Sequence, residues 1–275
     1  MRNKILYVLT EESRFFYLLN KELNSLKIKF VVLNFNAKIP NIPCIIITTS
    51  DEYNKIQSRI NTNVSILTYN KNEDFNQFII KILASYRIGY KENYLSLVFS
   101  IDPGMRHFGL VIFLDDYFLN SYTVYEKDDL IKTVKDYVNA IQENSSELIS
   151  LNFKLGSGIQ SICKDLITRI YDVFENRKNL KIQLVNESKS SKIRIHENKR
   201  KIPKHEAAAL VLSFRDGLEI KRNNFERIII QNNENNNFKA TCNDKILEEI
   251  AEKVLNGELS LNKSTEMLKS ETSHY

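Results

Sequence analysis

An aspartate near the middle of the chain has the setting that most strongly indicates chemistry. Asp102 ends the apolar stretch that starts at Leu95 and stands directly before Pro103-Gly104, and a second apolar run, 110–114, follows Gly109. Two such runs parted by a Pro-Gly turn predict a hairpin of adjacent strands, with the aspartate at its mouth. A carboxylate on a buried strand is costly unless it is hydrogen-bonded, paired or bound to a metal ion. Asp102 is therefore a candidate metal ligand, and the alternative is an ordinary hairpin whose aspartate caps its own turn.

The pattern Ile101-Asp102-Pro103-Gly104, followed after four residues by Gly109, resembles the first motif of the RNase H-like superfamily. It is most similar to the motif of RuvC-type Holliday-junction resolvases and their YqgF-type relatives. The resemblance implies phosphodiester hydrolysis with two divalent ions about 3.5–4 Å apart, one activating water and one stabilising the leaving oxygen. It implies Mg²⁺ (or Mn²⁺) as the cofactor. Because magnesium requires hard oxygen ligands, other carboxylates must join Asp102.

The second ligand implied by the resemblance is Glu187. The RuvC-type pattern has a glutamate at the end of the fourth strand, but Asn152 and Lys154 stand in that strand here. The YqgF-type pattern instead has a glutamate after the fifth strand, and the segment Leu184-Val185-Asn186-Glu187-Ser188 matches it. The alternative for Glu187 is a solvent-facing side chain at a strand end.

The third member is expected on the last helix, where relatives carry an acid just before an alanine-rich turn. Residues 204–212 read Lys-His-Glu-Ala-Ala-Ala-Leu-Val-Leu, and the small residues would let this helix lie close to the sheet. The resemblance assigns the position to either Glu206 or His205, which cannot point the same way because they are adjacent on a helix. Glu206 is the better magnesium ligand, whereas His205 could donate a proton or orient a water. Alternatively, both simply begin a helix near its positive end.

A basic segment lies between Glu187 and that helix. Among its cations stands a single acid, Glu197, and the cations are Lys189, Lys192, Arg194, Lys199, Arg200, Lys201 and Lys204. Such a segment beside a carboxylate cluster suits a phosphate backbone, because the cations attract the strand on which the site acts. We therefore expect a nucleic-acid partner, branched DNA or structured RNA; a solvated loop is the alternative.

The elements that must position these groups follow the RNase H-like order. Residues 94–222 predict three antiparallel strands, then helix, strand, helix, strand and helix, which gives a mixed five-stranded sheet with flanking helices. After the hairpin, the expected strands are 117–125, 148–155 and 181–185, and the expected helices are 128–142, 159–174 and 204–217.

Residues 1–87 predict a separate, small parallel α/β domain that is receiver-like. Its expected strands are 3–9, 30–33, 44–48 and 64–67, alternating with helices at 11–26, 51–60 and 73–86. Glu11, Glu12 and Asp51 follow strands, loosely as the acids of a response-regulator receiver do. No convincing lysine follows a fifth strand, so we interpret Asp51 as a helix cap and the domain as an accessory recognition or docking unit.

Residues 238–275 predict a helical hairpin or a helix-turn-helix-like tail, with helices at 244–255 and 260–269. Before it, residues 226–231 predict one more strand, and a polar connector follows.

The composition sets the class of protein. The chain has 275 residues, 43% of them hydrophobic, which suffices for real cores, and its net charge of +5 is compatible with a nucleic-acid partner. Three separated cysteines indicate neither a zinc site nor a disulfide framework. No run of about twenty apolar residues predicts a membrane span, and no signal peptide is apparent, so we expect a cytoplasmic protein.

We therefore expect a metal-dependent endonuclease. A homodimer is expected only if the substrate is a four-way junction, whose two symmetric strands suit a two-fold enzyme. The first alternative is a non-catalytic RNase H-fold protein that binds nucleic acid or regulates. The second is a signalling or protein-interaction module led by the N-terminal domain.

Overall fold

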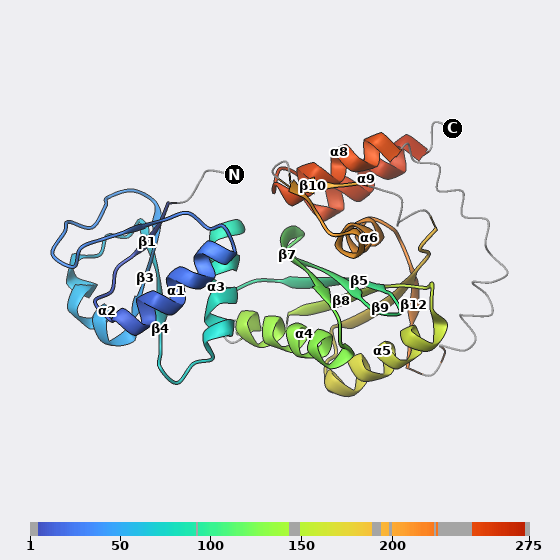
Figure 1. Cartoon of the computed structure of the whole chain (residues 1–275), viewed down its shortest axis with the longest axis horizontal. Coiled ribbons are helices and arrows are strands. Elements are labelled where there is room, and N and C mark those ends of the chain that lie inside the picture. Colours follow the sequence, from blue (N-terminus) through green and yellow to red (C-terminus); the bar gives the residue numbers. More distant parts are fainter. Residues whose placement is uncertain are drawn as a thin grey trace. The chain divides into compact units, whose positions relative to one another are not determined.

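The computed structural model describes residues 5–91, 93–142, 149–188, 194–197, 200–222, 224 and 244–272. The chain divides into two compact units, one formed largely by residues up to 92 and the other by most of the residues from 93 onward (Figure 1). Each unit has its own sheet. Within the described ranges, every helix is too short or too polar to cross a bilayer.

The first unit is built on a four-stranded sheet in the order β2-β1-β3-β4, and all its strand pairs are parallel. The strands are β1 (Ile5–Val8), β2 (Phe30–Val32), β3 (Cys44–Thr49) and β4 (Val64–Tyr69). The helices are α1 (Ser13–Ser25), α2 (Ser50–Ile56) and α3 (Phe75–Arg87), with a short 3₁₀ turn, η1 (Gln57–Arg59). Every residue of β3 is buried, as a central parallel strand requires. The predicted parallel α/β fold is confirmed.

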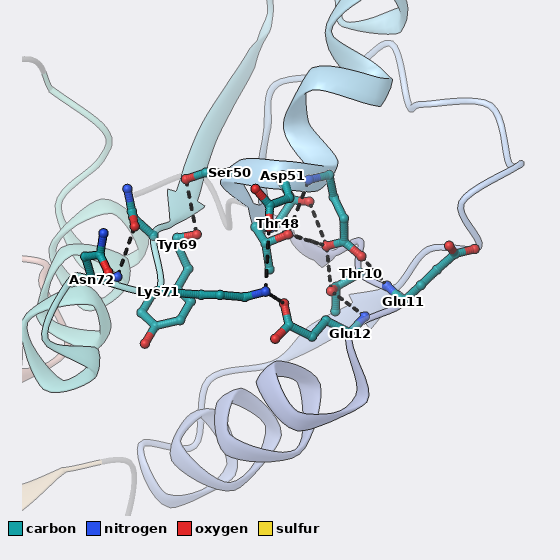
Figure 2. Close-up of polar contacts among 12 residues, drawn as sticks. Thr10, Glu11, Glu12, Thr48, Ser50, Asp51, Tyr69, Lys71 and Asn72 are labelled. Carbon is teal, nitrogen blue, oxygen red and sulfur yellow. Dashed lines mark hydrogen bonds and ion pairs between the residues drawn. The ribbon is translucent and has the colours of Figure 1, made fainter.

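A buried glutamate closes the first unit at the carboxyl ends of β1 and β3. Glu52 is the third residue of α2, and it forms a capping box with Thr49, which makes Thr49 the cap that the sequence assigned to Asp51. The Glu52 carboxylate also accepts hydrogen bonds from the Thr10 hydroxyl at 2.7 Å and the Glu11 N–H at 2.6 Å. Figure 2 shows Thr10 and Glu11 converging on this point.

A more exposed ion-pair group lies beside that network. Lys71, from the segment after β4, extends between two acids (Figure 2). Its Nζ lies 3.7 Å from the Glu12 carboxylate and 3.6 Å from that of Asp51. Pairs this open to solvent contribute little to stability.

The second unit is built on a six-stranded mixed sheet in the order β12-β9-β8-β5-β6-β7. Its strands are β5 (Ser96–Pro103), β6 (Phe108–Leu114), β7 (Tyr117–Val124), β8 (Ser150–Gly156), β9 (Leu180–Val185) and β12 (Leu218–Ile220). The first three are antiparallel neighbours, and β8 and β9 continue the sheet parallel to β5. Numbered within the unit, this order is 3-2-1-4-5, which is the RNase H-like arrangement predicted from the sequence.

The sixth strand was not predicted. β12 pairs antiparallel with β9 in the stretch where the sequence suggested the end of the last helix. That helix, α6 (Lys204–Ser213), ends earlier than expected. Gly217 then passes so close to β9 that a Cβ there would lie 2.7 Å from the Leu184 carbonyl oxygen. The chain can therefore turn from α6 directly onto the sheet edge.

Helices cover both faces of this sheet (Figure 1). One face carries α4 (Lys127–Gln142) and α5 (Gln160–Val173), and the other carries α6, with α8 (Asp244–Leu255) and α9 (Leu261–Thr272) behind it. Side chains alternate along a strand, so Val98, Ser100 and Asp102 of β5 all face α6. Accordingly, the Ser100 hydroxyl donates to the Ala209 carbonyl of α6 at 2.7 Å. The side chain of the candidate residue Asp102 therefore lies between the sheet and α6.

The C-terminal helices are part of the core of this unit. Leu247, Ile250 and Val254 of α8 belong to the same buried cluster as Leu210 and Phe214 beside the sheet. A two-stranded hairpin, β10 (His196–Glu197) with β11 (Arg200–Lys201), also adjoins α8. The predicted helical tail is thus a packed layer over α6. The predicted strand at 226–231 and the polar connector after it lie outside the described residues.

Candidate active site

Asp102 and His205 meet at the end of β5. The Nδ1 of His205, in the first turn of α6, lies 3.2 Å from the Oδ2 of Asp102, whose side chain is only 13% exposed. The helix approaches this closely because Gly109 of the neighbouring strand has no side chain. A Cβ on Gly109 would lie 2.0 Å from the His205 carbonyl oxygen. The close approach of α6 to Gly109 thus brings His205 to the end of β5, where Asp102 lies.

Glu187 reaches the same region from the end of β9. Its Oε1 accepts a hydrogen bond from the Gly158 N–H at 2.9 Å. The carboxylate fills space left open by two glycines, because a Cβ on Gly156 would lie 2.1 Å from Oε1 and one on Gly158 would lie 2.2 Å from Oε2. In the sequence, β8 has Asn152 and Lys154 where the RuvC-type pattern has a glutamate at the end of the strand. The structure shows that a carboxylate from the next strand occupies the place of its missing side chain.

The register of the sheet puts that carboxylate beside Asp102. Leu155 of β8 pairs with Ile101 of β5, so the next residues along, Gly156 and Asp102, are also neighbours. Paired residues on parallel strands point to the same face and lie about 4.8 Å apart. The Glu187 carboxylate therefore lies on the α6 face, one strand away from Asp102.

Burial makes both carboxylates reluctant to ionise. Burial raises the pKa of Asp102, and the hydrogen bond and charge of His205 only partly offset this. Burial likewise raises the pKa of Glu187, the Gly158 N–H lowers it, and the negative charge of Asp102 raises it further. A cation bound between them would relieve this unfavourable energy.

Lys154, which lies in the strand where the RuvC-type pattern has an acid, has a structural role. Its Nζ donates to the Ser213 carbonyl at 2.6 Å and the Arg215 carbonyl at 2.9 Å, satisfying groups at the end of α6. Burial lowers the pKa of Lys154 to about 8. Arg215 in turn donates to the Asn186 carbonyl at 2.6 Å, next to Glu187. These cations fix α6 and the end of β9, which carry two of the site residues.

Glu206 does not join Asp102 and Glu187, which corrects the expectation that it is the third ligand. Its carboxylate accepts hydrogen bonds from Ser121 at 2.5 Å and Thr123 at 2.9 Å, both on β7. The side chain is buried, and those two hydroxyls hold it at the opposite side of the hairpin. Of the two adjacent candidates, His205 is the one that faces Asp102.

The basic segment is described only in part. Lys189, Lys192 and Lys199 lie outside the described residues, and Arg200 and Lys201 are described only as backbone in β11. Arg194 and Lys204 are exposed. The Arg194 N–H donates to the Glu248 carboxylate of α8 at 3.0 Å, and His196 Nδ1 lies 3.4 Å from the carboxylate of Glu252. The described ends of the segment are thus attached to α8 and to the start of α6.

His107, which the sequence analysis did not select, lies against this site. Its ring meets that of His205 edge-on, with centroids 5.4 Å apart, and that of Tyr125 at 4.8 Å. Its Nδ1 is buried and has no hydrogen-bond partner among the described residues. The signal in the sequence was its place inside the turn that links Asp102 to Gly109.

The donor chemistry of the group fits a divalent cation. The two carboxylates are ligands that Mg²⁺ or Mn²⁺ can accept, and the imidazole is a ligand that Mn²⁺ accepts more readily than Mg²⁺. The 3.2 Å between Asp102 and His205 is close to the separation of about 3 Å expected for adjacent ligands of one ion. Among the described residues, however, no three His, Cys, Asp or Glu side chains stand close enough together to hold an ion without a movement of side chains.

Comparisons with known proteins add little. No protein-family model and no curated protein matches the chain. Aa-Ago, crystallised with externally bound siRNA, is 11% identical over 86% of this chain and 49% of its own, with a TM-score of 0.25. The C-terminal lobe of a budding yeast Argonaute is 12% identical over 68% and 56% of the respective chains, with a TM-score of 0.24. The Ppx/GppA family member of Aquifex aeolicus is 11% identical over 81% and 80%, with a TM-score of 0.14.

The chain thus spans about half the length of the Argonaute chains that it matches. TM-scores of this size carry no argument about activity. The RNase H-like assignment of the second unit rests on its own strand order.

Proposed function

We propose that the second unit is a metal-dependent nuclease of RuvC or YqgF character, which hydrolyses phosphodiester bonds in structured nucleic acid. The observation that carries the proposal is the placement of Glu187. Its carboxylate fills the space above Gly156, one strand from Asp102, where this fold would need its second acid. Two glycines kept free of side chains around one partly buried carboxylate are costly to maintain for stability alone.

Asp102 and Glu187 would hold the divalent ion, Mg²⁺ or Mn²⁺, with His205 beside them. Such an ion supplies a lowered pKa for an attacking water and stabilisation of the leaving oxygen. His205 keeps the Asp102 carboxylate in a fixed direction through their 3.2 Å contact. Gly158 performs the same role for Glu187 through its N–H. The protein's own part is therefore to hold two carboxylates, preorganised and partly desolvated, on one face of the sheet.

The substrate proposed is branched DNA or structured RNA. Cations of the 189–204 segment would hold the flanking phosphates, and the exposed Arg194 and Lys204 are its described members. Lys204 directly precedes His205, so a phosphate that it contacts would lie next to the carboxylates. A two-fold dimer is proposed only for a four-way junction as substrate.

A second candidate function is binding without cleavage. It is favoured by one observation: no three ligand side chains converge among the described residues, and Asp102 is already paired with His205. An RNase H-like protein that retained the surface but lost the ion would keep its salt-dependent affinity for nucleic acid.

Cleavage assays separate the two functions. The full chain is incubated with labelled four-way junction, flap and hairpin RNA in Mg²⁺, in Mn²⁺ and in EDTA. We expect cutting that requires the ion and that Asp102→Asn abolishes. Asp51→Asn, a change to an exposed acid of the first unit, is the matched control and should cut normally. Binding of all three substrates without ion-dependent cutting would leave the non-catalytic function as the correct one.

A further inference from the structure

We infer that His107 is an additional metal ligand of this site, and that it gives the site a preference for a transition ion such as Mn²⁺ or Co²⁺ over Mg²⁺. The inference rests on the proposed function, because it concerns the ion of the same site. It extends that function by a residue from the β5–β6 turn and by the class of ion.

The first observation is an unsatisfied polar atom. His107 Nδ1 is buried and, among the described residues, accepts or donates no hydrogen bond. Leaving a buried polar atom without a partner costs about 1–3 kcal/mol, and native proteins rarely tolerate it without a ligand, an ion or a water at that position. His107 thus has one buried nitrogen without a hydrogen-bond partner among the described residues, and this nitrogen belongs to a ring that contacts His205.

The second observation is the position of the ring. His107 and His205 meet with ring centroids 5.4 Å apart and planes at 73°. Metal–nitrogen bonds are about 2.1 Å long, so two imidazoles that share an ion bring their centroids to roughly 5 Å. His205 is itself in contact with Asp102 at 3.2 Å. His205 therefore contacts both the ring of His107 and the carboxylate of Asp102.

The turn holds His107 in this position. The Gly104 N–H donates to the His107 carbonyl at 3.0 Å, which closes the turn after Asp102. A Cβ on Gly104 would lie 2.5 Å from that carbonyl oxygen and 3.4 Å from the His205 ring. The absence of a side chain on Gly104 therefore allows the turn to close on the backbone of His107.

The donor set then decides the ion. Magnesium binds oxygen ligands and rarely imidazole, whereas Mn²⁺, Co²⁺ and the later divalent ions accept imidazole with increasing affinity. A site with two imidazoles and two carboxylates should therefore bind Mn²⁺ or Co²⁺ more tightly than Mg²⁺. Without His107 this preference should weaken, because one of the two nitrogen ligands is lost.

Metal titration of the full chain, without nucleic acid, tests the inference. Co²⁺ is added while its visible absorption is recorded, and Mn²⁺ binding is followed by electron paramagnetic resonance with Mg²⁺ as competitor. We expect His107→Ala to weaken Co²⁺ and Mn²⁺ binding at least about tenfold and to change the cobalt spectrum, with little effect on Mg²⁺. His196→Ala, which removes a histidine on the β10–β11 hairpin, should change neither quantity.

Unchanged Co²⁺ affinity and an unchanged spectrum in His107→Ala would overturn the inference. If that variant fails to fold, His107→Gln, which keeps most of the volume, decides by the same readouts. The outcome is separate from that of the cleavage assay. Ion binding that depends on His107 in a protein that cuts nothing would refute the nuclease only, and metal-dependent cutting with no role for His107 in ion binding would refute this inference only.

Discussion

Two glutamates, one in each unit, stand at the carboxyl ends of parallel strands and differ in how well the protein satisfies them. Glu52 accepts hydrogen bonds from Thr10, the Glu11 N–H and Thr49. Burial alone would raise its pKa, but these donors together lower the pKa below its usual value. Glu187, in contrast, accepts one hydrogen bond among the described contacts, from Gly158, and its pKa is raised.

The difference separates a structural carboxylate from one suited to bind a cation. In open α/β sheets, ligands bind where the strand order reverses, which in the first unit is between β1 and β3. The Glu52 carboxylate occupies that position, and it accepts the hydrogen bonds of Thr10 and the Glu11 N–H that a bound ligand would otherwise accept. Glu187 and Asp102 lie at the matching edge of the second sheet with their charges poorly compensated, and that imbalance favours an incoming ion.

The largest effect on cleavage should come from neutralising one of the two carboxylates in the second unit. Glu187→Gln removes a charge that would hold the ion, so the rate of metal-dependent cleavage should fall about a thousandfold, or about 4 kcal/mol of activation free energy. Glu52→Gln is the chemically identical change in the first unit and should leave the rate unchanged. A cleavage assay with both variants checks this. Equal losses of cleavage rate in the two variants would contradict the distinction between Glu187 and Glu52.

The free energy of unfolding should be more sensitive to Glu52→Gln than to Glu187→Gln, which is the reverse of the order expected for cleavage. Because the folded-state pKa of Glu52 is lowered, its contribution is present above the ordinary glutamate pKa of about 4.3 and is lost as pH falls through the folded value. Glu52→Gln should therefore lower the free energy of unfolding by about 2 kcal/mol at pH 7.

For Glu187→Gln, the matched variant in the second unit, we expect no loss of stability at pH 7. The pKa of Glu187 is raised on folding, so its ionised form is unfavourable at pH 7, and Glu187→Gln should leave stability unchanged or increase it. Chemical denaturation of both variants at pH 7 and pH 4 measures the two signs. A loss of stability in Glu187→Gln at pH 7 would mean that this carboxylate is structural as well.

Gly158→Ala should disturb function without disturbing the fold. A Cβ at this exposed position would displace the Glu187 carboxylate, whose end is flexible, and the backbone there has no positive φ that would resist alanine. We expect cleavage to fall at least about tenfold with an unchanged melting temperature. Gly257→Ala is the informative contrast, because Gly257 has a φ of 71° and alanine should cost stability there but not activity.

The smallest effect concerns Lys154, a perturbed group that we assign to structure. Its pKa is about 8 in the folded protein, so between pH 8 and 9 the unfolded chain holds more protons than the folded one. The free energy of unfolding should rise by about 1 kcal/mol across that interval. Lys154→Met should remove the rise. Denaturation of both proteins at the two pH values provides the measurement. The difference between them isolates the contribution of Lys154, because the Cys163 thiol, whose pKa burial raises to about 12, contributes with the opposite sign over the same interval in both proteins.

The sequence by itself predicted the order of elements and indicated the two carboxylates that we propose as metal ligands, Asp102 and Glu187. Alternating strands and helices predicted the parallel sheet of the first unit, and the run from Leu95 to Leu114 predicted the hairpin that carries Asp102. These features are readable because hydrophobic periodicity and Pro-Gly turns are local properties of the chain. The pattern after the fifth strand also pointed to Glu187, but it could not say what would surround it.

Only the tertiary structure decided between His205 and Glu206. Residues 206–213 are all buried, since α6 lies between the sheet and α8, so its sequence has no polar stripe that would reveal its rotation. The space above Gly156, the carbonyl partners of Lys154 and the contact of His107 with His205 were equally hidden. Each joins residues far apart in the chain or depends on the direction of a side chain, and such properties exist only once the sheet and α6 have packed together.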